Sequence, residues 1–487
     1  MEKNDITLSL QETLSGLIKA MSGTAELNIT KGVICGTPLA AVSLEGMVSA
    51  EQLGELVLRP LSELSAAGLD AKIHVLDHIT ENMLLTADRQ KVFSFDTAAE
   101  FLFSGFAVLF AQGRCYGCAL GLQGFEKRPV SSAESEPTLM CSQESFTETV
   151  RVNMALVRRR LKSKKLKMEL LKAGERSDTD VCLMYMTDRA PGDIIVRIKR
   201  ELSELELDTL LTVGALQPFI DDSYQSSVFT AVAVSERPDL ICSRLNEGRV
   251  CVLIDGVPFA MIVPSLFAEN FSTMDDYSSK PFYSAFIRWV RYLSFFLSVA
   301  FPGVYVALAD FHPEVFTLKL LLNLSVAEEA TPYPLVAEVI MLMIFFEIMR
   351  EAGLRLPKSV GSAVSIVGGL IIGDAAVKSG IVSAPLLIVV GITATASFVT
   401  PPIEQPVAVL RLIFIIAGGC AGLYGLAVCF TVLTANICAM NDFSVSYMSP
   451  AAPLDASALK DMIYRKTYRE YEKAHTKLSD IREGDNE

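Results

Sequence analysis

The chain has 487 residues, enough for about three domains, and a net charge of −13 argues against nucleic-acid binding as its overall function. Up to about residue 280 it is charged like an ordinary soluble protein, whereas 289–448 is almost free of charge. The soluble half shows no phosphate-binding loop, nucleophile elbow or paired histidine ligands, so we expect no enzyme, no cofactor and no metal site.

The N-terminal half is expected to stay in the cytoplasm, because MEKNDITLSL lacks the basic start and apolar core of a secretory signal. Ten mostly scattered cysteines agree with a reducing compartment. The CxxC motif from Cys115 to Cys118 lies in an expected hairpin, and a metal or redox role there is the alternative to buried thiols. His74 and His78 fall in KIHVLDHIT, which reads as a strand, so their rings are not expected to converge on a metal.

The soluble half contains an internal repeat. Residues 102–120 and 245–263 both read as a strand, a glycine-containing turn and a second strand, with glycines matched at an offset of 143 residues. Upstream, 42–64 and 183–205 both read as an apolar strand, a polar turn and an amphipathic helix. The repeat predicts two similar α/β subdomains, each ending in a hairpin that turns at a glycine.

These subdomains are expected at 1–135 and 175–275, with a linker at 136–174. Residues 151–172 hold nine Lys or Arg against one acid. This basic stretch is either a solvated helix face or a contact for anionic lipid headgroups or an acidic partner. The candidate contact residues are Arg158, Arg159, Arg160, Lys162, Lys164 and Lys165.

The second half, 285–449, predicts an α-helical multi-pass membrane domain, followed by a short helical tail at 450–487. Lys and Arg near the ends of its apolar segments place the N-terminal region and the tail on the inside, which requires an even number of crossings. Two of the five segments are short, so we expect four full spans, with 335–353 as an interfacial or re-entrant helix. The five segments are 292–309, 335–349, 359–373, 379–403 and 412–441.

The segment LVAEVIMLMIFFEIMREAG at 335–353 is apolar but carries three carboxylates, each costing about 2.5–3.5 kcal/mol at the centre of a membrane. Either the acids lie at the helix ends in the headgroup zone, or Glu347 and Glu351, which share a helical face, line a water-filled path or a subunit contact. The candidate gating or subunit-contact residues are Glu338, Glu347, Glu351, Arg350 and Arg355.

A stripe of small residues follows at 359–373. Such a stripe either lets helices pack closely or, in a symmetric oligomer, lines a narrow pore with Asp374 and Lys378 at its mouth. The candidate pore-lining residues are Gly361, Ser362, Ser365, Gly368, Gly369 and Asp374.

Six segments carry a resemblance to a known family. They are FTETVRVNMALVRRRLK (146–162), SERPDL (235–240), EGRVCVLIDGVPFAMIVP (247–264), FHPE (311–314), FEIMREAGLRLPKSVGSAVSIVGGLIIGDAAVKSGIVS (346–383) and YMSPAAP (447–453). In this order they resemble the A subunit of GerA-type spore germinant receptors. The match runs from about residue 140 to 453, and the first 140 residues resemble the family less closely.

The resemblance implies a multi-pass protein of the spore inner membrane, with its N-terminal region and tail facing the spore core. It implies a transporter-like B subunit that binds the nutrient, a C-subunit lipoprotein, and a ring of A subunits, expected to be a pentamer. The ring would be a nutrient-gated channel for monovalent cations that triggers germination, with 359–373 as the pore candidate. The alternative is a paralogue, channel or scaffold, that works without a nutrient-binding B subunit.

The chain departs from the family pattern at three places. Met343 and Lys319 stand where the family commonly has acids, and TPPIEQP (400–406) replaces a simpler loop. In a ring, the loss of a carboxylate and the gain of a cation in every subunit would change the charge that passing ions meet. Ion preference and nutrient responsiveness are therefore where this chain is expected to differ.

Overall fold

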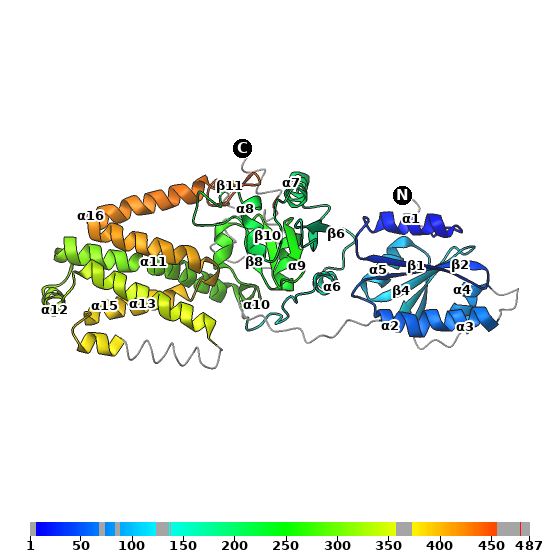
Figure 1. The fold of residues 1–487 in the computed structure, drawn as a ribbon, viewed down its shortest axis with the longest axis horizontal. Coiled ribbons are helices and arrows are strands. Elements are labelled where there is room, and N and C mark those ends of the chain that lie inside the picture. The colour runs from blue at the N-terminus through cyan, green and yellow to red at the C-terminus, as the bar shows by residue number, and fades with distance from the viewer. Residues whose placement is uncertain are drawn as a thin grey trace.

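The computed structural model describes residues 6–67, 74–82, 88–122, 136, 138–356, 373–454 and 478. Three parts follow one another along the molecule: a sheet with helices on both faces, a second such sheet, and a helical bundle (Figure 1). The N-terminal sheet and the bundle lie at opposite ends, with the second sheet between them.

The N-terminal sheet is antiparallel and has helices on both faces. Its strands are β1 (Leu27–Ile34), β2 (Thr37–Leu44), β3 (Arg89–Val92), β4 (Phe106–Ala111) and β5 (Gly117–Gly121), in the order β1-β2-β4-β5-β3. Its helices are α1 (Leu10–Ala20), α2 (Ala50–Leu53), η1 (Gly54–Leu58), α3 (Arg59–Ala67), α4 (Val75–Asp77), η2 (His78–Asn82) and α5 (Phe95–Phe103). Because side chains alternate along a strand, Ala40 and Val42 face α1 and α5, while Leu39 and Ala41 face the other helices.

The second sheet is built in the same way. Its strands are β6 (Leu166–Ala173), β7 (Thr179–Met186), β8 (Ala233–Ser235), β9 (Val250–Ile254) and β10 (Ala260–Val263), in the order β6-β7-β9-β10-β8. Its helices are α6 (Val150–Arg160), α7 (Gly192–Ser203), η3 (Val213–Ala215), α8 (Gln217–Ile220), α9 (Pro238–Asn246), η4 (Phe267–Phe271) and α10 (Asp275–Ser278). Val181 and Leu183 face α7, while Cys182 and Met184 face α6 and α9.

The two sheets repeat one plan, since β1, β2, β4, β5 and β3 take the same places as β6, β7, β9, β10 and β8. The glycines matched at an offset of 143 residues all have positive φ: +83° at Gly105 and +95° at Gly248, +89° at Gly113 and +85° at Gly256. This conformation favours glycine. The repeat that the sequence predicts is therefore present in the strand order and in the turns.

Residues 74–82 form short helical turns, so the strand expected there is wrong. His74 precedes α4, and its Nδ1 accepts a hydrogen bond from the Leu76 N–H at 3.2 Å. Val75, Leu76 and Ile79 are buried under the sheet at helical spacing, which outweighs the strand-like composition. Among the described residues no group of three or more His, Cys, Asp or Glu is placed to hold a metal ion, and all ten cysteines are free.

Helices form the rest of the described chain as far as residue 439. They are α11 (Pro281–Phe311), η5 (Pro313–Val315), α12 (Leu318–Glu329), α13 (Leu335–Arg355), α15 (Ala384–Ser397), η6 (Pro401–Ile403) and α16 (Glu404–Ala439), and residues 373–378 are also helical. Within the parts that the structure describes, two stretches are long and apolar enough to cross a membrane, Pro281–Phe311 and Pro401–Ala439. A short hairpin of β11 (Asn441–Asp442) and β12 (Val445–Ser446) follows.

α16 consists of two helical arms joined by a sharp reversal (Figure 1). Ala421 and Gly422 leave helical geometry, Gly422 with φ +57° and ψ −145°. The rings of Phe414 and Phe430 lie 4.8 Å apart, although a straight helix would separate them by about 24 Å. The single span expected at 412–441 is therefore wrong, and each arm is about 26 Å long. The first arm covers residues 404–420 and the second arm 423–439.

Both arms pack along α11, in opposite directions. A Cβ on Gly418 of the first arm would lie 2.4 Å from the Gly303 carbonyl oxygen, so glycine permits this close approach. On the second arm Phe430 packs against Phe296, nearer the start of α11. Both ends of α16 therefore lie at the sheet-facing end of the bundle, and its reversal lies beside Phe311 at the outer end.

α13 is a continuous helix of 21 residues that runs antiparallel to the first arm. Its Val336 lies beside Gly419 at the outer end, and its Arg350 pairs with Glu404 at the sheet-facing end. The structure thus places α13 inside the bundle, which differs from the interfacial or re-entrant helix expected for 335–353. Ion pairs to the neighbouring helix offset the cost of its acids.

α15 is shorter than the apolar segment that contains it. The sequence predicts a long span at 379–403, but the helix covers 14 residues, Ala384–Ser397. Pro401 and Pro402 begin a 3-10 turn soon afterwards. Proline disfavours helical geometry in the residue before it and donates no backbone hydrogen bond, so the helix ends ahead of this pair.

The bundle packs directly against the second subdomain. Phe267 and Phe271 of η4 make edge-to-face contacts with Phe295 of α11. The Asp276 carboxylate accepts hydrogen bonds from Arg288 at 3.0 Å and from Arg291 at 2.8 Å. Apolar and ionic contacts together hold the start of α11 against the sheet.

Candidate functional site

A buried arginine in α16 organises the sheet-facing half of the bundle. Arg411 is 1% exposed; its Nε donates to the Ser298 carbonyl oxygen at 2.8 Å, and its Nη1 donates to Glu347 Oε1 at 3.1 Å. The guanidinium lies 5.8 Å from the centre of the Phe346 ring, and Nη1 lies 3.8 Å from the Met343 sulfur. One arginine thus ties α16 to both α11 and α13.

Two further charges extend this contact into the α13–α16 cluster, which we define as Arg411, Glu347, Arg350 and Glu404. Arg350 pairs with Glu347 at 2.6 Å and with Glu404 at 2.8 Å. Two arginines and two glutamates leave no net charge. Burying a charge in an apolar bundle is costly unless an opposite charge meets it, and here each one has such a partner.

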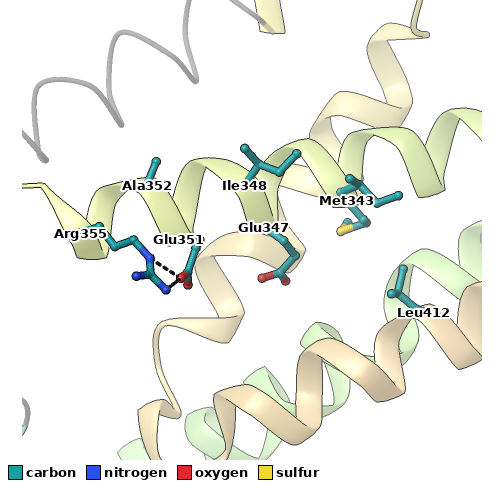
Figure 2. A pocket seen from close by; sticks show the side chains of 8 residues that line it. Met343, Glu347, Ile348, Glu351, Ala352, Arg355 and Leu412 are labelled. Carbon is teal, nitrogen blue, oxygen red and sulfur yellow. Dashed lines mark hydrogen bonds and ion pairs between the residues drawn. The ribbon is translucent and has the colours of Figure 1, made fainter.

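An open groove of about 550 Å³ lies beside the cluster along α13 (Figure 2). Figure 2 shows Met343 and Glu347 pointing from α13 toward the helix that carries Leu412. Further along α13, Arg355 donates to Glu351 at 2.7 Å. The groove therefore combines carboxylates with an apolar floor. Its lining residues are Met343, Ile344, Glu347, Ile348, Glu351, Ala352, Arg355 and Leu412.

Four of the five candidate gating residues lie together and one lies apart. Glu347 and Arg350 belong to the α13–α16 cluster, and Glu351 pairs with Arg355 at the edge of the groove. Glu338 lies near the outer end of α13 and is 1% exposed. A gating or subunit-contact role for any of them stays a prediction.

Most of the candidate pore-lining residues lie outside the described residues. Asp374 is described, and its carboxylate pairs with Lys378 at 2.7 Å, with both side chains exposed. The pore expected from the small-residue stripe stays a prediction from the sequence. The candidates outside the described residues are Gly361, Ser362, Ser365, Gly368 and Gly369.

Arg158, expected at a lipid or partner contact, is buried between the two subdomains. Its side chain is 0% exposed; Nη2 donates to Glu26 Oε1 at 2.6 Å and Nε donates to Oε2 at 2.9 Å. The backbone oxygens of Ser163 and Leu166 accept its remaining hydrogen bonds at 2.9 and 3.0 Å. Glu26 belongs to the N-terminal subdomain, so the pair joins the subdomains, and Arg158 is not available to a lipid headgroup or a partner.

Most of the other basic residues form ion pairs within the chain. The pairs are Arg159 with Glu144, Arg160 with Glu144, Lys164 with Asp96, and Lys165 with Asp188. Lys162 is exposed. Internal carboxylates thus neutralise much of the stretch, and a lipid or partner contact by these five residues stays a prediction.

Two carboxyl groups meet where the end of α16 reaches the second subdomain. Asp221 and Asp442 are 3% and 1% exposed. Asp221 accepts hydrogen bonds from the Ser223 N–H at 2.9 Å and from the Thr230 hydroxyl at 2.6 Å. Asp442 Oδ1 accepts one from the Asp222 N–H at 3.0 Å, while its Oδ2 has no partner among the described residues. Burial and the neighbouring Asp221 raise the pKa of Asp442 to about 6.

Asp442→Asn is expected to stabilise the protein at pH 7 and to have little effect near pH 4. Because the folded-state pKa of about 6 lies above the ordinary 3.8, the folded protein loses stability as the pH rises from about 4 to 6, and the loss persists above that. An amide escapes this loss, a gain on the order of 2–3 kcal/mol at pH 7. Thermal unfolding of the full-length protein in detergent, across this pH range, measures the gain.

Asp222→Asn is the matched control. The Asp222 side chain is 64% exposed and pairs with Arg197 at 2.7 Å, so its loss is expected to bring no stabilisation at pH 7. An Asp442→Asn protein no more stable than the unaltered one at pH 7 would contradict the prediction.

Sequence reasoning missed Arg411, Glu404 and the pair of Asp221 and Asp442. Arg411 had a usable signal, because it is a lone base directly before the apolar run 412–441, and charges in such runs are functional candidates. Asp221 and Asp442 lie more than 200 residues apart in the chain, and no local pattern predicts their contact.

The chain matches the family described as Bacillus/Clostridium GerA spore germination protein over residues 16–476. It is 35% identical over 429 residues to the spore germination protein KA of Bacillus subtilis (strain 168), covering 88% of this chain and 78% of that protein. It is 33% identical over 473 residues to the uncharacterized membrane protein YfkQ of the same organism, covering 94% and 89%. It is 26% identical over 395 residues to the stage V sporulation protein AF of that organism, covering 80% and 78%.

One solved structure with a similar fold is the N-terminal domain of the A subunit of the Bacillus megaterium spore germinant receptor GerK3. It has 24% sequence identity and a TM-score of 0.44, and covers 55% of this chain and 99% of that chain. The match to the family extends well beyond that domain and through the helical bundle. The chain belongs to the GerA spore germination protein family.

Proposed function

We propose that this chain is the membrane-embedded A-type subunit of a germinant receptor, and that copies of it form a nutrient-gated cation channel in the spore inner membrane. The family and the names of its relatives support a role in germination. The resemblance supplies the partners: a transporter-like B subunit, a C-subunit lipoprotein and further copies in a ring.

The α13–α16 cluster is the observation that carries the channel proposal. A helical anchor needs only apolar contacts, whereas charges held inside an apolar bundle commonly mark ion paths or moving contacts. The cluster lies at the sheet-facing end, where η4 packs on α11 and the first arm begins. We infer that a displacement of the second subdomain alters these ion pairs and so opens the path.

The proposal also assigns an orientation. Lys and Arg near the segment ends favour a sheet-facing end in the spore core, together with the N-terminal region and the tail. α11, α13 and both arms of α16 run between this end and the outer end. On this proposal the reversal in α16 adds a crossing where the sequence predicts one span.

Cation flux from liposomes tests the channel. With its B and C partners and the nutrient present, the purified protein is expected to release K⁺, and Gly368→Leu in the predicted pore segment to lower that flux by about tenfold. Gly391→Leu on α15 is the matched control, because a Cβ there meets nothing within 4 Å. Liposomes that retain their cations under every combination of partners would contradict the proposal.

A paralogue that aids germination without a nutrient-binding B subunit, as a channel or a scaffold, is the second candidate. Met343 favours it, because the Met343 sulfur lies beside Arg411 where the resemblance implies an acid. Spores lacking the gene separate the two candidates. Loss of the response to one nutrient supports a receptor subunit, whereas slower germination with every nutrient supports the paralogue.

A further inference from the structure

Four polar side chains from separate helical segments meet near the outer end of the bundle, where Figure 1 places α12. We call this group the outer polar site: Tyr305 of α11, Glu328 of α12, Glu338 of α13 and Ser383, which precedes α15. Tyr305, Glu338 and Ser383 are 9%, 1% and 3% exposed. The Ser383 N–H donates to Glu338 Oε2 at 3.3 Å, and Tyr305 interacts electrostatically with both glutamates.

The outer polar site is poor in hydrogen bonds. Among the described residues, twelve buried side-chain nitrogen or oxygen atoms have no hydrogen-bond partner, and four of them lie here. They are Tyr305 OH, Glu328 Oε1, Glu338 Oε1 and Ser383 Oγ. Each unpartnered buried polar atom costs about 1–3 kcal/mol, so four at one place require a common explanation.

The charges at the outer polar site are of one sign. The charged groups that act on Glu328 are Asp310 and Glu338, and those that act on Tyr305 are Glu328, Glu338 and Asp310. All three are acids. A buried carboxylate without an opposite charge is costly, and the helices packed here supply no such charge among the described residues. The compensating charge must therefore come from outside the chain or from a proton.

The donor set favours a cation over other ligands. Carboxylate and hydroxyl oxygens are hard ligands that suit alkali and alkaline-earth ions. Among the described residues no group of three or more His, Cys, Asp or Glu is placed to hold a metal ion, which argues against a divalent or transition metal. Two carboxylates with two hydroxyl groups fit the lower charge of an alkali ion.

We propose that the outer polar site binds a partly dehydrated alkali-metal cation, Na⁺ or K⁺, which joins the outer ends of α11, α12 and α13 to the start of α15. Glu338 is the central ligand because it is the most deeply buried carboxylate of the group. Glu328 adds the second charge, and the Tyr305 and Ser383 oxygens complete the shell. The cation supports the bundle, and this role does not depend on the chain forming a channel.

Thermal unfolding of the full-length protein in detergent tests the site. Melting temperatures are compared in sodium, potassium and N-methyl-D-glucamine chloride at equal ionic strength and near-neutral pH. We expect Na⁺ or K⁺ to raise the melting temperature saturably by about 3 °C over the bulky organic cation. Because ionic strength is held constant, general screening cannot produce this difference.

Two variants locate the effect. Glu338→Gln keeps the shape of the side chain but removes its charge, and is expected to abolish the cation-dependent rise. Tyr305→Phe removes one oxygen, and is expected to raise the cation concentration for half the effect by about fivefold. Tyr424→Phe on α16 is the matched control, since Tyr424 is 77% exposed, and is expected to melt like the unaltered protein. If Glu338→Gln fails to fold, Tyr305→Phe decides.

Two results would overturn the proposal. Equal melting temperatures in all three salts would mean that protons or water satisfy these oxygens. A cation-dependent rise that survives both Glu338→Gln and Tyr305→Phe would place the cation elsewhere. Liposome flux keeps this proposal apart from the channel: a variant that loses the cation-dependent rise but still conducts supports the site and leaves the channel standing.

Discussion

Replacing Arg158 with methionine is expected to lower the free energy of unfolding of the full-length protein by about 3–5 kcal/mol. The substitution leaves the Glu26 carboxylate, whose side chain is 2% exposed, buried without its cation. Thr24 still donates to it at 3.1 Å, which compensates for a small part of the loss. Denaturant unfolding in detergent, with hydrogen exchange of β1 and β6 as a local readout, measures the effect.

Arg159→Met is the matched control for this prediction. Arg159 is the next residue on α6, and it pairs with Glu144 at a site where both side chains are 32% exposed. Its loss is expected to cost less than about 1 kcal/mol. Adding Glu26→Gln to Arg158→Met removes the stranded charge and is expected to recover part of the stability. Equal losses for Arg158→Met and Arg159→Met would contradict the buried-pair interpretation.

Arg411→Leu is expected to destabilise the helical bundle by about 3–5 kcal/mol, because Glu347 loses one of its two cations and the Ser298 carbonyl oxygen loses its donor. Arg411→Lys is expected to recover little, since an ammonium group cannot reach both acceptors with the planar fork of a guanidinium. The amount of folded protein in detergent and its melting temperature report the loss.

Arg355→Leu provides the comparison for Arg411. It removes an arginine from the neighbouring helix, but this side chain is 79% exposed and pairs only with Glu351 among the described residues. We expect a change within about 0.5 kcal/mol. A bundle that tolerates Arg411→Leu as well as Arg355→Leu would show that the α13–α16 cluster is not structural, and would remove the physical basis for its proposed gating role.

Short-range patterns predict the soluble half well. The duplication is visible because its signals are local: a glycine at each turn, an apolar strand before it, and an amphipathic helix with apolar residues at regular spacing. The matched glycines keep positive φ in both copies, which is why the offset of 143 residues survives in the sequence. The segment 74–82 escapes this reasoning because a histidine cap and three apolar residues specify a helical turn too short to read as periodic.

Contacts between distant parts of the chain are not predictable in this way. The basic stretch looks solvent-facing because nothing near it in sequence is acidic, yet Glu26 lies 132 residues before Arg158. The glycines of α16 predict close packing, and Gly418 confirms this against Gly303, but the same composition does not show that the helix turns back at Gly422. Composition reports what a residue permits, and the partner decides which option is used.

The reversal in α16 has a mechanical consequence. The first arm starts at Glu404, which is tied to α13, and the second arm leads into the β11–β12 hairpin, where Asp442 accepts from the backbone of the second subdomain. A hairpin fixed at its two feet and free at its tip acts as a lever about 26 Å long. A tilt of about 5° at the feet would carry the tip by about 2 Å, the size of helix shift that accompanies many switching transitions. Small movements of the second subdomain would thus be largest on the opposite side of the membrane.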